Sequence, residues 1–184
     1  GTLARGIVGA GVKMEYILFD DCYMSSVEVA YELKEATRFL IASTSEMMAY
    51  GMPYAIVGEF LLGNPDYGSL CEGFHDFYST YEMMPCGTLA VTDCSELDNM
   101  AAIMKSINDR YVFDYSLQGE LQGLDGYTPV IFYDFADYVL TLCSDPVLTA
   151  RFREQLERLV PYKPHTSKFY SRAKGTFPLS LIHI

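Results

Sequence analysis

Cys22 combines a nucleophilic side chain with a position between a buried strand and a helix, which is where a catalytic nucleophile would be placed. A thiolate attacks a peptide carbonyl, and a nearby imidazole keeps the thiol ionised and later protonates the leaving amine. Asp21 comes directly before the cysteine, and a negative charge there raises the thiol pKa unless the side chain points away. The alternative for a single cysteine is an unreactive, buried side chain, because free cysteine usually packs as a small apolar residue.

Three predicted elements place Cys22. Residues 16–19 (YILF) form a continuous apolar run, which predicts a strand covered on both faces in a mostly parallel sheet. A helix follows, in which Ser25 and Glu28 match a capping box, and a second strand is predicted over 38–42. In open α/β sheets, ligands bind outside the carboxyl ends of the strands, and this order places Cys22 at such an end.

Length and composition narrow the class of protein. A chain of 184 residues, half of them hydrophobic, is long enough for one domain with a sizeable core. The formal net charge of -11 argues against nucleic acids and anionic membranes as partners, because both recruit clusters of Lys and Arg; a cationic substrate suits it better. The sequence shows no membrane-spanning apolar run and no secretory leader at Gly1.

The remaining cysteines and the histidines are the other candidates for metal binding, disulfide formation or catalysis. The five cysteines include no CxxC pair and no zinc-finger spacing, so neither a metal site nor a disulfide framework is predicted. Four of them are interpreted as core or near-surface thiols: Cys71, Cys86, Cys94 and Cys143. The histidines are His75, His165 and His183, and a packed or surface role is favoured for His75 because it lies in an aromatic helical segment.

A longer pattern surrounds the cysteine: FDDCYM over 19–24, VEVAYEL over 27–33, IAS over 41–43 and then Glu46. This pattern resembles the clostripain family of cysteine peptidases, most densely over 16–54 and more weakly to about residue 170. The resemblance implies an α/β fold, specifically a caspase-hemoglobinase-like three-layer α/β/α sandwich with a mostly parallel sheet. It also implies a Cys-His dyad, and in caspase-type enzymes the histidine lies about 50 residues before the cysteine. No histidine precedes Cys22, so we expect the chain to be a fragment that lacks its N-terminal part and the general base.

The resemblance assigns two site residues. Cys22 is the nucleophile, and its backbone N–H is expected to donate to the oxyanion. Asp20 is expected to shape an acidic pocket for Arg or Lys at P1, where a buried carboxylate makes a charge-assisted contact; alternatively, Asp20 only ends the strand or caps the next turn. Tyr50 replaces a second acid of the family and Asp21 replaces a small residue, so the basic P1 preference is a hypothesis.

Two functions stay open. One is the catalytic core of a clostripain-like cysteine endopeptidase acting on polypeptides, and the other is a non-catalytic relative that binds peptides. No cofactor is assigned, and calcium is implied by the resemblance alone, because no EF-hand spacing is present. Secretion or display on a bacterial surface is likewise implied only by the resemblance, and no oligomeric state is predicted.

The rest of the chain is interpreted as scaffold. Residues 1–176 form a partial peptidase domain, and the tail 177–184 (FPLSLIHI) departs from the family pattern and is either a short strand or a non-native end. Helical spacing predicts helices over 53–62, 67–81, 93–111, 130–143 and 146–160, with a strand over 87–92 and a loop over 114–127.

Overall fold

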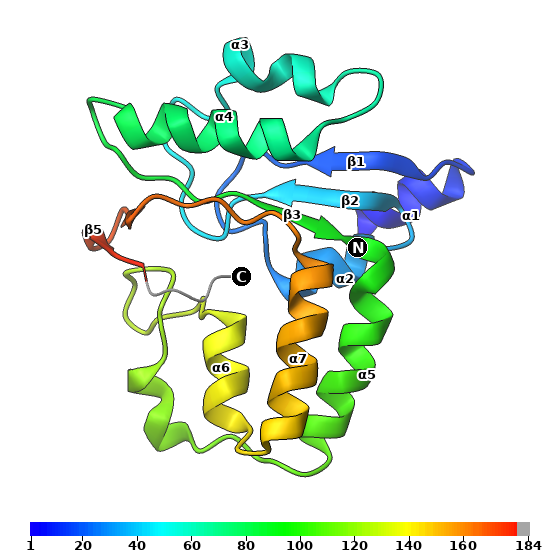
Figure 1. The fold of residues 1–184 in the computed structure, drawn as a ribbon, viewed down its shortest axis with the longest axis vertical. Helices are drawn as coiled ribbons and strands as arrows, with labels where there is room; N and C mark the ends of the chain where they lie inside the picture. The colour runs from blue at the N-terminus through cyan, green and yellow to red at the C-terminus, as the bar shows by residue number, and fades with distance from the viewer. Residues whose placement is uncertain (180–184) are drawn as a thin grey trace.

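A three-stranded sheet lies at the centre of the computed structural model, which describes residues 1–179 (Figure 1). The strands β1 (Met14–Leu18), β2 (Thr37–Ala42) and β3 (Ala90–Asp93) are hydrogen-bonded in that order. β1 and β2 run parallel, whereas β2 and β3 run antiparallel. The α/β class is confirmed, but the described sheet is small and mixed, so the expectation of a mostly parallel sheet is wrong for these strands.

The middle strand is buried on both faces because helices pack on each side. Leu40 and Ala42 of β2 belong to one apolar core, and Ile41 belongs to the other, as the alternation of side chains along a strand requires. In Figure 1, α4 (Tyr67–Thr80) lies on one side of the sheet, and α2 (Val27–Leu33), α5 (Leu97–Asn108) and α7 (Pro146–Leu159) lie on the other. The apolar run over 16–19, by contrast, belongs to β1, the edge strand of the described sheet, whose residues 16–18 contact the two cores but are only half-buried.

Side-chain caps fix the start of the helices nearest the site. Ser26 caps α2, and its hydroxyl accepts the Val29 N–H at 3.3 Å. The predicted capping box is therefore wrong by one residue, because Ser25 is buried and its N–H donates to the Ser43 carbonyl at 2.9 Å. Asp145 caps α7, with Pro146 in the first turn, as the sequence indicates.

The remaining helices are short. The predicted helix over 130–143 is reduced to α6 (Phe135–Leu142), because the N–H groups of Ile131 and Phe132 donate to the buried Asp125 carboxylate instead of to helical carbonyls. The predicted loop over 114–127 contains a 3-10 helix, η3 (Tyr115–Glu120). The other helices are α1 (Thr2–Gly9), α3 (Tyr54–Val57), η1 (Gly58–Leu61) and η2 (Cys94–Glu96).

The C-terminal part forms a hairpin that the sequence analysis did not predict. β4 (Lys168–Ser171) pairs antiparallel with β5 (Gly175–Pro178). Residues 177 and 178 of the predicted tail lie in β5, whereas residues 180–184, His183 included, lie outside the described residues. All five cysteines are free thiols, and all except Cys22 are buried. Within residues 1–179, no helix is long and apolar enough to cross a membrane.

Candidate active site

Cys22 follows β1, and its sulfur is held by the segment that follows β2. The Met47 N–H donates to the Cys22 Sγ at 3.3 Å, and the Met47 carbonyl lies 3.8 Å from the same sulfur. Cys22 is half-buried. Because β1 and β2 are parallel neighbours, their carboxyl ends bring the thiol and its hydrogen-bond donor together.

Tyr23 forms a strained turn directly after the thiol. Its φ of 58° is in the left-handed region, which a non-glycine residue adopts only when its surroundings hold it there. The Tyr23 N–H donates to the Ser45 carbonyl at 3.0 Å, and its hydroxyl donates to Glu46 at 3.1 Å. Its ring stacks on Phe132, with the centroids 4.5 Å apart. These contacts fix the turn and thereby fix the direction of the Cys22 side chain.

A buried cluster of hydroxyl groups supports the segment after β2. The Thr88 hydroxyl lies 2.8 Å from the Ser43 hydroxyl and 2.9 Å from the Ser45 hydroxyl, and it accepts the Ser45 N–H at 3.2 Å. The carbonyls of Ser43 and Ser45 in turn accept the N–H groups of Ser25 and Tyr23. Sequence reasoning missed Thr88, because a threonine just before a short apolar strand gives no signal of its partners.

The surroundings of Cys22 keep its thiol protonated. Burial raises the thiol pKa above its ordinary value of 9.0, and the negative charges of Glu46 and then Asp21 raise it further, against the Met47 N–H, which lowers it. The described residues alone therefore do not produce the thiolate that a nucleophile requires at neutral pH.

Asp21 also occupies the backbone N–H that we expected to serve the oxyanion. One Asp21 carboxylate oxygen accepts the Cys22 N–H at 2.8 Å. An oxyanion can use this N–H only after the Asp21 side chain rotates away, and Asp21 is exposed, which leaves it room to do so.

Asp20 is exposed and not buried, in contrast to the carboxylate envisaged from the sequence. Its carboxylate accepts the Met52 N–H at 2.9 Å. Gly51 passes so close that a Cβ there would lie 2.8 Å from an Asp20 oxygen. The pKa of Tyr54 is raised by burial and then by Asp20. Asp20 therefore faces the segment 51–54 and keeps access to solvent.

The described histidines lie in other contacts. His75 on α4 hydrogen-bonds Ser79 at 3.2 Å, and the Nδ1 of His165 lies 3.0 Å from the Thr166 carbonyl oxygen. Neither takes part in the hydrogen bonds of Cys22. Within residues 1–179, no group of three or more His, Cys, Asp or Glu side chains is placed to bind a metal ion.

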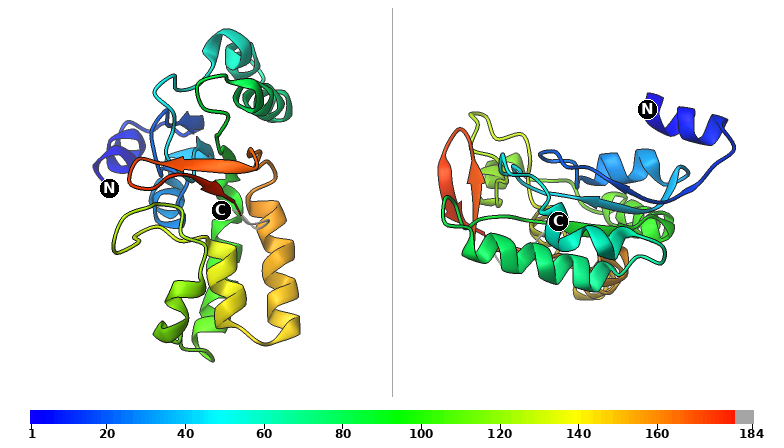
Figure 2. Two further views of the ribbon diagram at one scale, coloured as in Figure 1. Left: turned by 90° about the vertical axis from the view of Figure 1, so that its left-hand side faces the viewer. Right: turned by 90° about the horizontal axis from the view of Figure 1, so that it is seen from above.

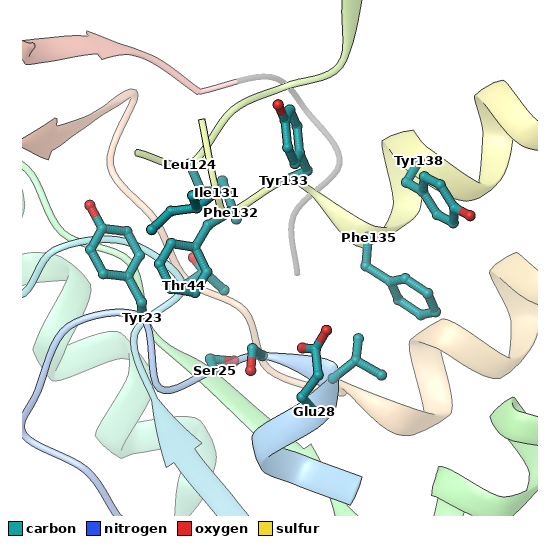
Figure 3. Close-up of a pocket in the computed structure, with 12 residues that line it drawn as sticks. Tyr23, Ser25, Glu28, Thr44, Leu124, Ile131, Phe132, Tyr133, Phe135 and Tyr138 are labelled. Atoms are coloured by element: carbon teal, nitrogen blue, oxygen red, sulfur yellow. The ribbon is translucent and has the colours of Figure 1, made fainter. Parts of the chain in front are cut away.

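Two pockets adjoin the residues around Cys22. One has a volume of about 330 Å³ and is lined by Tyr23, Thr44 and residues of α2 and of the segment 124–138 (Figure 3). The other, of about 430 Å³, is lined by residues 46–50 with Tyr81, Met83, Met84, Tyr170 and Arg172. Tyr23 and Glu46, which line different pockets, are joined by the hydrogen bond of the Tyr23 hydroxyl.

Comparison with known proteins identifies the group to which this arrangement belongs. A model of the clostripain family matches residues 5–148. A clostripain from Bacteroides thetaiotaomicron, solved in complex with a peptide inhibitor, is 63% identical with a TM-score of 0.96, and the alignment covers 98% of this chain and 81% of that one.

Two further solved structures are similar. A secreted C11 cysteine protease from B. thetaiotaomicron is also 63% identical, with a TM-score of 0.96, but the match covers 98% of this chain and only 51% of that one. An inactive zymogen C11 protease from Parabacteroides distasonis is 29% identical, with a TM-score of 0.82 and coverage of 99% and 54%. A search of curated proteins found no match. The chain, with its free cysteine at the end of β1, thus belongs to the clostripain family of cysteine peptidases.

Proposed function

We propose that this chain carries the nucleophile of a cysteine endopeptidase, which cleaves peptide bonds after Arg or Lys through a Cys-His dyad whose histidine lies in a segment outside this chain. The observation that carries the proposal is the position of Cys22: a half-exposed thiol on a strained turn at the carboxyl end of β1. The raised thiol pKa is consistent with a missing partner, because an adjacent imidazolium would lower it.

The open edge of β1 leaves room for a further strand that would carry the proposed catalytic histidine. Within the described residues, β1 pairs only with β2, and Met14 on β1 is 44% exposed. A further parallel strand on this edge would end next to Cys22, so a histidine at its end would reach the thiol. Such a strand would also extend the sheet toward the three-layer sandwich that the family resemblance implies.

The carboxylate of Asp20 is the reason to propose a preference for Lys or Arg at P1. Its exposed carboxylate is fixed by the Met52 N–H but keeps acceptor capacity, and a Lys or Arg side chain would complete it. The inhibitor bound to the similar B. thetaiotaomicron clostripain, BTN-VLTK-AOMK, has a peptide part that ends in lysine. One similar protease is described as secreted, and we propose the same location for the protein that contains this chain.

The test uses the full-length protein that contains this chain and quenched fluorescent peptides with Lys, Arg or norleucine at P1. We expect cleavage after Lys and Arg, and complete loss of cleavage in Cys22→Ala. Asp20→Asn should lower kcat/KM for the Lys peptide about 10- to 100-fold, the range of one charge-assisted contact. Asp76→Asn, which removes a charge from an 85% exposed side chain, is the control and should change little.

Peptide binding without cleavage, with equal affinity for the wild type and Cys22→Ala, would refute catalysis. The non-catalytic peptide-binding relative would then be the better account. Cleavage with no preference between Lys and norleucine would refute the role of Asp20 alone.

A further inference from the structure

The smaller pocket beside the nucleophile has aromatic walls and a single charged residue. Its described lining includes five aromatic side chains, from Tyr23, Phe132, Tyr133, Phe135 and Tyr138. Glu28 is the charged residue, and no Lys or Arg is among the described lining residues. Figure 3 shows the Glu28 carboxylate rising from α2 toward the space between α2 and the 131–138 segment.

Glu28 is available to a ligand. Its side chain is exposed, and it forms no salt bridge within the described residues. The faces of aromatic rings attract cations, and an unpaired carboxylate beside them adds a charge partner. A Lys or Arg side chain has the matching chemistry, because its aliphatic stem packs on apolar surface while its charged end stays near solvent.

The aromatic wall is held in place before any ligand binds. The buried Asp125 carboxylate accepts the N–H of Phe132 at 2.7 Å and that of Ile131 at 2.9 Å. The Leu124 N–H donates to the Phe132 carbonyl at 2.8 Å, and the Phe132 ring stacks on Tyr23. A preorganised wall reduces the ordering cost of binding.

The pocket is separate from the place proposed for the P1 side chain. Asp20 contacts Gly51 and Met52, and neither of these residues nor Asp20 lines the pocket. Tyr23, which follows Cys22 directly, does line it. A peptide that reaches Cys22 can therefore place its P1 residue at Asp20 and another side chain in this pocket.

We infer that this aromatic pocket with Glu28 is a second specificity site, which takes a basic side chain of the substrate other than the P1 residue. The inference rests on the proposed function for the identity of the ligand as a peptide. The pocket is a different site from the proposed Cys-His dyad and from the proposed P1 site at Asp20.

The experiment uses the full-length protein and peptides with Lys fixed at P1. Each of the positions P3, P2, P1′ and P2′ carries Lys, norleucine or Glu in turn. We expect one position to prefer Lys over norleucine by about 3- to 30-fold in kcat/KM, the range of one cation–π contact or exposed ion pair. Glu28→Gln should reduce this preference to the part that the aromatic rings supply, and Glu28→Lys should shift it toward Glu. Glu35→Gln removes a charge from another exposed side chain, which is outside the pocket lining, and should leave the preference intact.

The affinity of Cys22→Ala for the same peptides, measured by fluorescence anisotropy, separates this inference from the proposed function. Discrimination between Lys and norleucine in binding, without cleavage by the wild type, would keep the pocket and refute the peptidase. Cleavage in which no position prefers Lys, or in which Glu28→Gln leaves the preference unchanged, would overturn the pocket and leave the peptidase intact.

Discussion

Replacing Thr88 with valine tests whether the buried hydroxyl cluster supports the segment that follows β2 and contacts Cys22. Thr88 is 3% exposed, and its hydroxyl contacts the hydroxyls of Ser43, Thr44 and Ser45 and the Ser45 N–H. Valine keeps the shape but removes the hydroxyl. Ser43 keeps a partner in the Ser45 carbonyl, and the Ser45 N–H keeps the Ser43 hydroxyl.

Thr88→Val removes the hydrogen bonds that the Thr44 and Ser45 hydroxyls form with the Thr88 hydroxyl. A buried polar group left without a partner costs about 1–3 kcal/mol, so two such groups, with partial relaxation, should lower the free energy of unfolding by about 2–4 kcal/mol. With a urea slope of about 2–3 kcal/mol per molar, the unfolding midpoint should fall by about 1 M or more.

Thr92→Val is the matched control for this change. Thr92 lies four residues further along the chain, on β3, and is 4% exposed, but its hydroxyl makes no hydrogen bond in the described part of the chain. We expect it to change the free energy of unfolding by less than about 1 kcal/mol. If Thr88→Val is no more destabilising than Thr92→Val in urea unfolding of the same protein, the cluster does not contribute as argued.

Three further predictions concern the thiol and the residues around it. Gly51→Ala should destabilise the protein and weaken the preference for Lys at P1, because the φ of Gly51 is +72° and the new Cβ would collide with Asp20. Gly63→Ala is the control, because the φ of Gly63 is +68° but its surroundings are open, so only the backbone strain should lower the stability. Equal decreases in the melting temperature of the two variants would contradict the contact with Asp20. In the isolated chain, Cys22 alkylation by iodoacetamide should keep accelerating above pH 9.0, because burial, and then Glu46 and Asp21, raise the thiol pKa. Asp21→Asn should lower that pKa and speed alkylation at neutral pH, and an unchanged rate by mass spectrometry would show that the Asp21 charge does not reach the thiol.

Helical spacing and apolar runs in the sequence predicted individual helices and strands, because these elements depend mainly on neighbouring residues. The helix α7 followed from the helical spacing over 146–160, and the strand that ends before Cys22 followed from its apolar run. The antiparallel direction of β3 did not, because a short apolar run carries no information on direction. The family resemblance supplied the identity, which periodicity alone would not have separated from other α/β folds.

Side-chain hydrogen bonds to the backbone of other segments explain two features that the sequence did not predict, the shortened helix α6 and the role of Glu46. Asp125 looks like an ordinary loop acid, yet its carboxylate organises the wall of the aromatic pocket and prevents helix formation over 131–132. Glu46 was part of the family pattern without a role, and the structure shows that it accepts hydrogen bonds from Tyr23 and from the Arg172 N–H of the β4–β5 turn. These partners of Asp125 lie 6 and 7 residues away and those of Glu46 lie 23 and 126 residues away, so neither set follows from the repeat of a helix or a strand.

The electrostatics of the site suit a nucleophile that is completed by a cation. Without one, burial and two carboxylates keep the Cys22 thiol protonated, and Asp21 covers the backbone N–H that an oxyanion would use. An imidazolium beside the sulfur would lower the thiol pKa and would also attract the exposed Asp21 carboxylate away from that N–H. A single positive charge beside the sulfur would relieve both features, which is the role that the proposed Cys-His dyad gives to its histidine.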